Sequence, residues 1–126
     1  MPAITSVPTP HSPIGLRLEG KPALHRIDVF LRGEVEVQDE GSQLLALAVG
    51  ARRGEMVADF CAGGGGKTLA LGAAMRNTGR LYAFDVSAHR LAQLAPRLAR
   101  SGLGNVHPVA IAHERDERIT RLAAKM

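Results

Sequence analysis

Two aspartates and a run of glycines between them suggest a binding site for a nucleotide-like ligand. Asp59 is followed by glycine at residues 63–66 and then by Lys67 and Thr68. Glycines let the backbone turn tightly and let a ligand approach the main chain, while free amides at the start of a following helix favour polar or anionic groups. The pattern therefore predicts a nucleotide-binding turn between a strand and a helix.

A P-loop is the first kind of nucleotide site to compare with this turn. It requires a glycine, four further residues and then Gly-Lys followed by Ser or Thr. Gly66, Lys67 and Thr68 supply the end of that pattern, but Cys61 stands where the first glycine belongs. The P-loop is therefore our second interpretation.

Two other nucleotide sites also begin with a glycine loop. The dinucleotide fingerprint Gly-x-Gly-x-x-Gly fails, because its third glycine would fall on Thr68 or Lys67. An acid followed four residues later by Gly-x-Gly, as at Asp59, Gly63 and Gly65, is instead the usual opening of an S-adenosylmethionine site. That interpretation fits the spacing best.

Asp85 supplies a second acid in the right place. It closes an apolar run, residues 81–84, and lies twenty residues after Gly65. An acidic side chain at the end of a second strand can accept hydrogen bonds from both ribose hydroxyls. The alternative is a solvated turn aspartate before Ser87. Because two acids flank the glycine loop, we expect a site for the ribose of S-adenosylmethionine.

These residues resemble a known family. Residues 59–68 are similar to the signature Asp-x-Cys-Ala-x-Pro/Gly-Gly-Gly-Lys-Thr of the Sun (Fmu) family of RNA cytosine-5 methyltransferases. Residues 37–44 resemble the family's Val-Gln-Asp-Glu-x-Ser/Ala-Gln element, and residues 85–91 its Asp-x-Ser-x-x-Arg-Leu helix. The resemblance extends over residues 30–106.

The resemblance implies an α/β protein with the Rossmann-like fold of S-adenosylmethionine-dependent methyltransferases, here a partial parallel sheet with flanking helices. In it the glycines would face the methionyl part of the cofactor, Asp85 the ribose and Asp59 the amino group. Lys67 could neutralise the methionyl carboxylate, and Arg90 could cover the adenine or pair with Asp85. The full set of residues expected to contact the cofactor is Asp59, Cys61, Ala62, Gly63, Gly64, Gly65, Gly66, Lys67, Asp85 and Arg90.

Two departures from the family bear on activity. Residues 109–114 carry alanine or histidine where the family has a third acid facing the adenine, and the sequence stops at Met126, before both catalytic cysteines of the family. Methylation of cytosine carbon 5 needs a thiolate that adds at carbon 6. The one thiol, Cys61, is expected to be a semi-buried neighbour of the ligand, not the nucleophile. We therefore expect a cofactor-binding fragment with no catalytic residue, inactive alone.

Composition agrees with a protein that handles RNA. The net charge is +4, the isoelectric point is near 10, and thirteen of the sixteen basic residues are arginines, which suit phosphate contacts. The family resemblance implies ribosomal RNA as the partner. No apolar run is long enough to span a membrane, no leader pattern opens the chain, and the five histidines show no metal-ligand spacing, so we expect a cytoplasmic protein without membrane or metal. Several arginines could equally lie on solvated helix faces: Arg97, Arg100, Arg115, Arg118 and Arg121.

The apolar pattern predicts the strands and helices around the glycine loop. Residues 1–26 hold five of the seven prolines and are expected to form an extended arm, a remnant of a preceding region. Residues 27–126 are expected to be the N-terminal half of a methyltransferase domain. We expect a hairpin at 27–31 and 35–37, strands at 57–60, 81–85 and 105–111, and helices at 42–49, 68–75 (ended by Gly79), 88–101 (kinked at Pro96) and 119–124.

Three further expectations remain open. The strand at 57–60 should have an exposed edge that a second copy could cover, giving a homodimer. A P-loop-like nucleotide hydrolase would need a magnesium-binding aspartate on a later strand. A non-catalytic RNA-binding module would instead need a basic face and no ligand in the pocket.

Overall fold

A three-stranded parallel sheet carries the glycine loop. The computed structural model describes residues 5–123 and 125. In it the sheet has the order β3 (Met56–Asp59), β4 (Arg80–Asp85) and β5 (Val106–Ala110), with Val57 opposite Leu81 and Leu81 opposite Val106. The expected strands are thus confirmed to within two residues. Because all three run in one direction, their carboxyl ends meet at one edge, where the loop after β3 lies.

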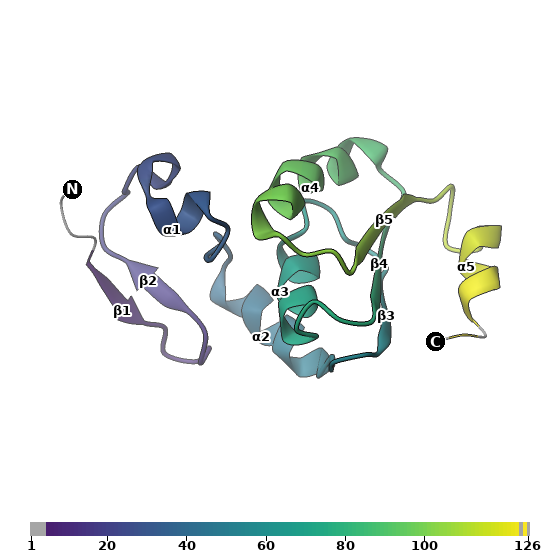
Figure 1. Ribbon diagram of the computed structural model, residues 1–126, viewed down its shortest axis with the longest axis horizontal. Coiled ribbons are helices and arrows are strands. Elements are labelled where there is room, and N and C mark those ends of the chain that lie inside the picture. Colours follow the sequence, from purple (N-terminus) through teal and green to yellow (C-terminus); the bar gives the residue numbers. More distant parts are fainter. Residues whose placement is uncertain (1–4, 124, 126) are drawn as a thin grey trace.

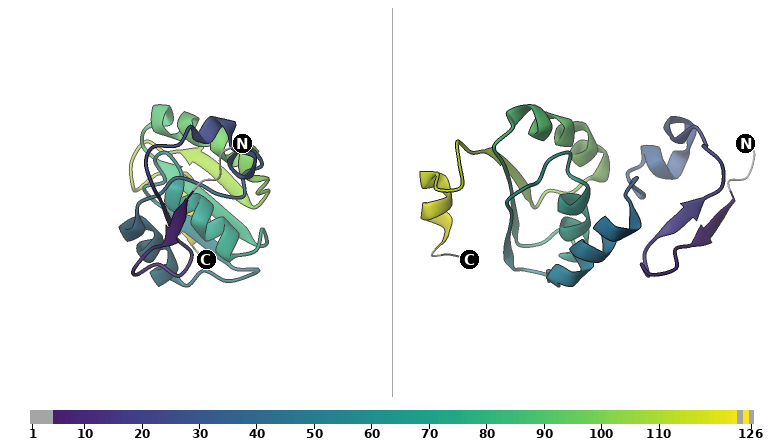
Figure 2. Two further views of the ribbon diagram at one scale, coloured as in Figure 1. Left: turned by 90° about the vertical axis from the view of Figure 1, so that its left-hand side faces the viewer. Right: turned by 180° about the vertical axis from the view of Figure 1, so that it is seen from behind.

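Helices cover one face of this sheet. α3 (Gly66–Ala74) connects β3 to β4, α4 (Ala88–Ser101) connects β4 to β5, and α2 (Glu40–Val49) packs beside α3. Figures 1 and 2 show all three helices on the same side of the sheet. Their apolar side chains enclose Met75, Leu81, Ala83 and Leu94, none of which is exposed. This core fixes the helices that flank the site.

The other face of the sheet carries a row of rings. The centroids of Phe60 and Phe84 lie 5.5 Å apart, those of Phe84 and Tyr82 6.0 Å, and those of Tyr82 and His107 5.5 Å. Successive side chains of a strand point to opposite faces, so Tyr82 and Phe84 lie on one side of β4 while Leu81 and Ala83 lie on the other. The α/β layering expected from the sequence is confirmed.

Local signals explain where α2 and α4 begin and end. Asp39 caps α2 by accepting a hydrogen bond from the Ser42 amide at 2.8 Å, and Ser87 caps α4 by accepting one from the Arg90 amide at 3.1 Å. Gly50 and Gly102 end them with φ of +66° and +73°. Pro96 lies inside α4, as expected.

The predicted role of Gly79 at the end of α3 is wrong. The residue after this helix is Met75, and the left-handed backbone falls on Arg76 and Asn77, with φ of +54° and +56°. The Asn77 side chain uses that turn to accept hydrogen bonds from the amides of Gly104 and Asn105, at 2.7 and 3.2 Å. The turn is therefore stabilised by contacts with the β5 side, which the local sequence does not reveal.

The N-terminal part forms a small separate unit. β1 (Ser6–Pro8) and β2 (Leu16–Leu18) pair antiparallel, followed by the 3-10 helix η1 (Leu24–Arg26) and α1 (Asp28–Leu31). Both strands are edge strands, consistent with a proline-rich segment that cannot form a central strand. The predicted hairpin at 27–31 and 35–37 is wrong, because residues 28–31 are helical and residues 35–39 pair with no strand in the described part of the chain.

The C-terminal segment ends in a short helix, α5 (Glu117–Ala123), at the end of the molecule opposite the β1–β2 hairpin (Figures 1 and 2). The helix expected at 119–124 is therefore present, although residue 124 lies outside the described residues. None of the helices described here combines the length and the apolar character that a membrane span requires; α4, the longest, has 14 residues.

Candidate functional site

The Asp59 carboxylate braces both ends of the glycine loop. Its Oδ1 accepts a hydrogen bond from the Cys61 amide at 3.1 Å, and its Oδ2 accepts one from the Thr68 hydroxyl at 2.7 Å. Thr68 is fully buried in the first turn of α3. A carboxylate has about four acceptor positions, so Asp59 keeps capacity for a further donor. Contact with the amino group of a cofactor stays a prediction.

Asp85 joins the end of β4 to the loop from the other side. Its Oδ2 accepts a hydrogen bond from the Gly63 amide at 2.9 Å, while its Oδ1 accepts from the Ser87 amide at 2.8 Å and from Arg90 Nη2 at 3.2 Å. Only 2% of Asp85 is exposed. The hydrogen bond from the Ser87 amide is the main cause of a lowered pKa of this carboxyl, and the Gly63 amide and the charged Arg90 guanidinium lower it further, while burial opposes the shift.

Arg90 takes one of its two expected roles in this structure. Its guanidinium pairs with Asp85 at 3.2 Å, while 57% of the arginine side chain stays exposed. The pair closes the carboxyl end of β4 and leaves Asp85 ionised. Lys67 follows the loop in the first turn of α3 and is exposed, where its side chain can approach a ligand carboxylate.

A cavity of about 370 Å³ lies against the loop. Its size falls in the range of small-molecule sites. Seven of the ten predicted cofactor residues line it: Cys61, Ala62, Gly63, Gly64, Gly65, Gly66 and Lys67. The remaining three, Asp59, Asp85 and Arg90, lie outside its lining, and the two aspartates hydrogen-bond the loop. The structure therefore brings the predicted set together around one turn.

Cys61 departs from its expected environment. The sequence predicts a semi-buried thiol, whereas this residue is exposed at the cavity wall. Its amide is held by Asp59 and its side chain is left at the surface of the loop. The thiol is the single cysteine of the chain, which makes it a selective chemical probe of the cavity.

Sequence reasoning missed the wall that faces the loop. Gln38, Asp39, Ser42 and Arg97 complete the cavity lining. Three of them lie at the start of α2, where the sequence indicated only a helix cap. A solvated helix face was one of two alternatives left open for Arg97, but just 24% of its side chain is exposed.

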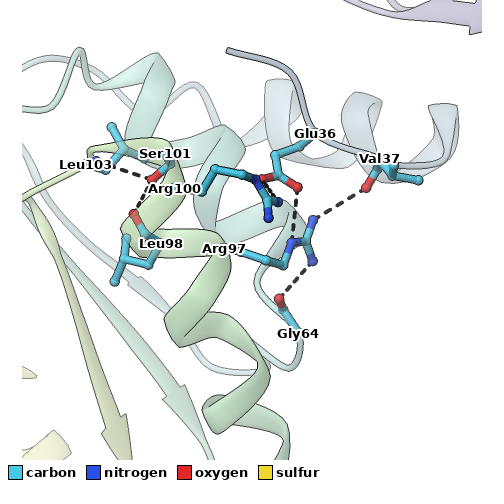
Figure 3. Close-up of polar contacts among 8 residues, drawn as sticks. All are labelled: Glu36, Val37, Gly64, Arg97, Leu98, Arg100, Ser101 and Leu103. Carbon is cyan, nitrogen blue, oxygen red and sulfur yellow. Dashed lines mark hydrogen bonds and ion pairs between the residues drawn. The ribbon is translucent and has the colours of Figure 1, made fainter. Parts of the chain in front are cut away.

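Arg97 reaches the loop from α4. Its guanidinium donates to the Gly64 carbonyl at 2.8 Å, to Glu36 Oε2 at 3.2 Å and to the Val37 carbonyl at 3.4 Å (Figure 3). One sequence signal could have found it. Arg97 lies three residues after Leu94, and Leu94 is the buried side chain beneath Gly65, so a helix places both beside the loop.

The position of the family's third acid is occupied differently. The stretch 109–114 offers no aspartate, and Asp116, further on, folds back to accept a hydrogen bond from the Ala112 amide at 3.0 Å. Its carboxylate also pairs with Arg118 at 2.9 Å, and that guanidinium is the main cause of a strongly lowered pKa of Asp116. Among the described residues no group of three or more His, Cys, Asp or Glu side chains is arranged to hold a metal ion.

Solved structures identify the class of protein first. The chain is similar to a methyltransferase homologue from Pyrococcus horikoshii, with a TM-score of 0.76 and 34% identity, over 84% of this chain and 35% of that one. It is also similar to NSun6 from the same organism, with a TM-score of 0.68 and 27% identity, over 77% of this chain and 27% of that one. The fold is therefore the Rossmann-like fold of S-adenosylmethionine-dependent methyltransferases.

Sequence comparison then gives the family. Residues 46–122 match the profile of the family described as 16S rRNA methyltransferase RsmB/F. A mouse 28S rRNA (cytosine-C(5))-methyltransferase is 38% identical over 64% of this chain and 17% of its own length, and the ribosomal RNA small subunit methyltransferase B of Citrobacter koseri is 35% identical over 75% of this chain and 22% of its own. The chain belongs to the RsmB/F family and spans about a fifth of these relatives. The family inferred from residues 59–68 is confirmed.

Proposed function

We propose that this chain is an S-adenosylmethionine-binding fragment of an RNA cytosine-5 methyltransferase that acts on ribosomal RNA. The observation that carries the proposal is the glycine loop, held between Asp59 and Asp85 against a cavity of about 370 Å³. Two findings support it: membership of the RsmB/F family, and the likeness to NSun6, whose structure contains the S-adenosylmethionine analogue SFG.

The residues fit the cofactor chemically. The methionyl part would lie against residues 63–66, with its carboxylate toward Lys67 and the start of α3, where free amides favour an anion. A ribose hydroxyl would donate to Asp85, which accepts three hydrogen bonds here and keeps one acceptor position. The amino group would donate to Asp59. When bound, the cofactor supplies an electrophilic methyl group on its sulfonium.

These residues hold the cofactor without completing the reaction. Transfer to cytosine carbon 5 requires a thiolate that adds at carbon 6 of the same ring. The single thiol, Cys61, follows β3 at the cavity wall, so we assign it no nucleophilic role and expect the 126 residues to bind without turnover. The arginine-rich composition suits contact with RNA phosphates in the complete reaction.

Calorimetric titration with S-adenosylmethionine tests the site, with ATP and magnesium as the comparison. We expect saturable binding of S-adenosylmethionine, and slower alkylation of Cys61 by iodoacetamide when the ligand is present. Asp85→Asn should weaken the binding, whereas Arg32→Gln, a change at an exposed residue outside the cavity lining, should not. Binding of ATP alone would establish the P-loop interpretation instead, and failure of both ligands to bind a folded protein would refute the proposal.

The free edge of β3 supports one further element of the proposal. Within the described sheet β3 pairs only with β4, so its outer edge offers unpaired backbone groups. We propose that a second copy can pair there. Sedimentation velocity at increasing concentration checks this, and a strictly monomeric protein would contradict it.

A further inference from the structure

One arginine of α4 links three segments that are distant in sequence. The Arg97 guanidinium contacts the Gly64 carbonyl, the Glu36 carboxylate and the Val37 carbonyl at once. Figure 3 shows its side chain extending from α4 between the glycine loop on one side and residues 36 and 37 on the other. Because only 24% of the Arg97 side chain and 19% of that of Glu36 are exposed, these contacts are partly shielded from water.

The contact with Gly64 fixes one peptide group of the loop. Arg97 Nη1 binds the carbonyl of Gly64, and the amide of Gly65 on the other side of the same peptide bond donates to the Ala62 carbonyl at 2.9 Å. Since a peptide group is planar, holding both of its ends fixes its orientation. Gly65 then adopts φ of +97° and leads directly into α3. Arg97 therefore helps to set the backbone on which a ligand would lie.

The contacts with Glu36 and Val37 fix the opposite wall. The segment of residues 33–39, here called the connecting segment, leads directly to Gln38 and Asp39 in the cavity lining. It packs closely against α4: a Cβ at Gly33 would overlap the Arg100 carbonyl. Gly33 also has φ of +76°, so glycine suits this position on both grounds. Arg97 thus joins two walls of the same cavity through one planar group.

We propose that Arg97 is a positioning residue for cofactor binding: it holds the glycine loop and the connecting segment in register before the ligand arrives. The identity of the ligand in this inference rests on the proposed function, whereas the effect of Arg97 on the conformation of the glycine loop does not. A guanidinium suits the task because its five donors lie in a rigid plane and can serve separate acceptors, whereas a lysine ammonium is a point charge on a flexible stem.

Arg100 provides a matched control on the same helix. It also pairs with Glu36, and 21% of its side chain is exposed, close to the value for Arg97. Its guanidinium lies 4.2 Å from the ring centroid of Phe30, and it makes no hydrogen bond to the glycine loop among the described residues. A change at Arg100 therefore weakens the connecting segment without releasing Gly64.

The test compares Arg97→Gln, Arg97→Lys and Arg100→Gln in the full chain. We expect Arg97→Gln to accelerate hydrogen exchange of the Gly65 amide about tenfold without ligand and to weaken S-adenosylmethionine binding about tenfold, since it removes a charge-assisted hydrogen bond. Arg97→Lys should lie between this variant and the wild type. Arg100→Gln should leave Gly65 exchange within about twofold of the wild type and should weaken binding less than Arg97→Gln does, even if both variants lose the same thermal stability.

The possible results separate the two proposals. Wild-type exchange and affinity in Arg97→Gln, or equal losses in Arg100→Gln, would overturn the role of Arg97. If the wild type bound no S-adenosylmethionine, the proposed function would fail, while Gly65 exchange would still decide the role of Arg97 in the loop. Should Arg97→Gln not fold by circular dichroism, the same two measurements on Arg97→Lys decide the question.

Discussion

The sheet unit, residues 56–110, and the N-terminal region, residues 5–39, are held in place by different forces. The sheet unit surrounds apolar side chains with no exposure, among them Met75, Leu81 and Phe84. In the N-terminal region only Ser12 and Gly15 are buried. This region is attached to the rest mainly through two glutamates: Glu36, which pairs with α4, and Glu40, which binds the hairpin.

Because different forces hold them, the two regions can be perturbed separately. Apolar burial responds little to salt or pH, whereas ion pairs and charge-assisted hydrogen bonds weaken with salt and with protonation of the acid. The cofactor cavity lies where the regions meet, because its lining combines the glycine loop with Gln38 and Asp39. Its geometry therefore depends on both kinds of force.

The largest effect is expected from Gly65→Ala in the sheet unit. Gly65 has φ of +97°, and a Cβ there would overlap the fully buried side chain of Leu94. Backbone strain and overpacking should together lower the free energy of unfolding by about 3 kcal/mol. Urea denaturation followed by circular dichroism measures the loss.

Gly64→Ala is the matched control for that variant. A Cβ at Gly64 would lie 3.7 Å from Arg97 Nη1, an ordinary contact, and the residue is not among those with positive φ. We expect a change below about 1 kcal/mol. Equal losses in the two variants would mean that the apolar core beneath the loop does not determine its conformation.

Asp85→Asn should have the next largest effect, and a dependence on pH. The asparagine amide keeps one oxygen acceptor but lacks the negative charge to which three groups donate hydrogen bonds. The free energy of unfolding should therefore fall by about 2 kcal/mol at pH 7. The pKa of Asp85 is lowered in the folded state, so its contribution is present above the unfolded pKa and is lost as the pH falls through the folded one. The wild type and the variant should therefore converge in stability below about pH 4. A constant difference from pH 7 to pH 2 would contradict this.

The same division explains what the sequence could predict. The strands and α4 follow from local patterns that agree with burial: Leu91 and Leu94 lie at helical spacing on the buried face, and Asp59 and Asp85 end consecutive apolar runs. Glycine at Gly63 and Gly65 marks the loop because both need positive φ. The fold class and the position of the glycine loop could thus be predicted from the sequence.

The connecting segment was not predictable in the same way. Residues 35–37 alternate like a strand, yet their conformation is set by Glu36, whose partners Arg97 and Arg100 lie more than sixty residues away. A local pattern cannot encode an ion pair at that separation. The turn at Asn77 escaped prediction for the same reason, since its side chain binds Gly104, which lies 27 residues away.

Glu36→Gln should release the connecting segment while the sheet unit stays folded. The change removes the negative charge that the partly buried guanidiniums of Arg97 and Arg100 share. The attachment of the connecting segment should therefore weaken by about 1 to 2 kcal/mol. Hydrogen exchange should accelerate across residues 27–39 and stay unchanged in β4. In Glu34→Gln, which removes an ion pair with side chains 61% and 56% exposed, exchange should stay at the wild-type rate. Faster exchange in β4 would show that the two regions are one cooperative unit.

The smallest effect is expected from Glu40→Gln at the hairpin. Glu40 Oε2 accepts hydrogen bonds from the amides of His11 and Ser12 at 2.6 and 2.7 Å, and the Ser12 bond is the main cause of its lowered pKa. The attachment of the hairpin to Glu40 is therefore complete above the ordinary glutamate pKa. It is lost as the pH falls through the lower pKa that Glu40 has in the folded protein.

The amide resonances of His11 and Ser12 report that attachment directly. In the wild type they should shift together as the pH falls below about 4.5, and Glu40→Gln should show the shifted positions already at pH 7. Glu19→Gln removes a glutamate charge within the N-terminal region itself and should leave the titration unchanged. Because the sheet unit does not rely on Glu40, unfolding of β4 should keep its wild-type midpoint in both variants; a lowered midpoint in Glu40→Gln would show that the hairpin contributes to the stability of the sheet.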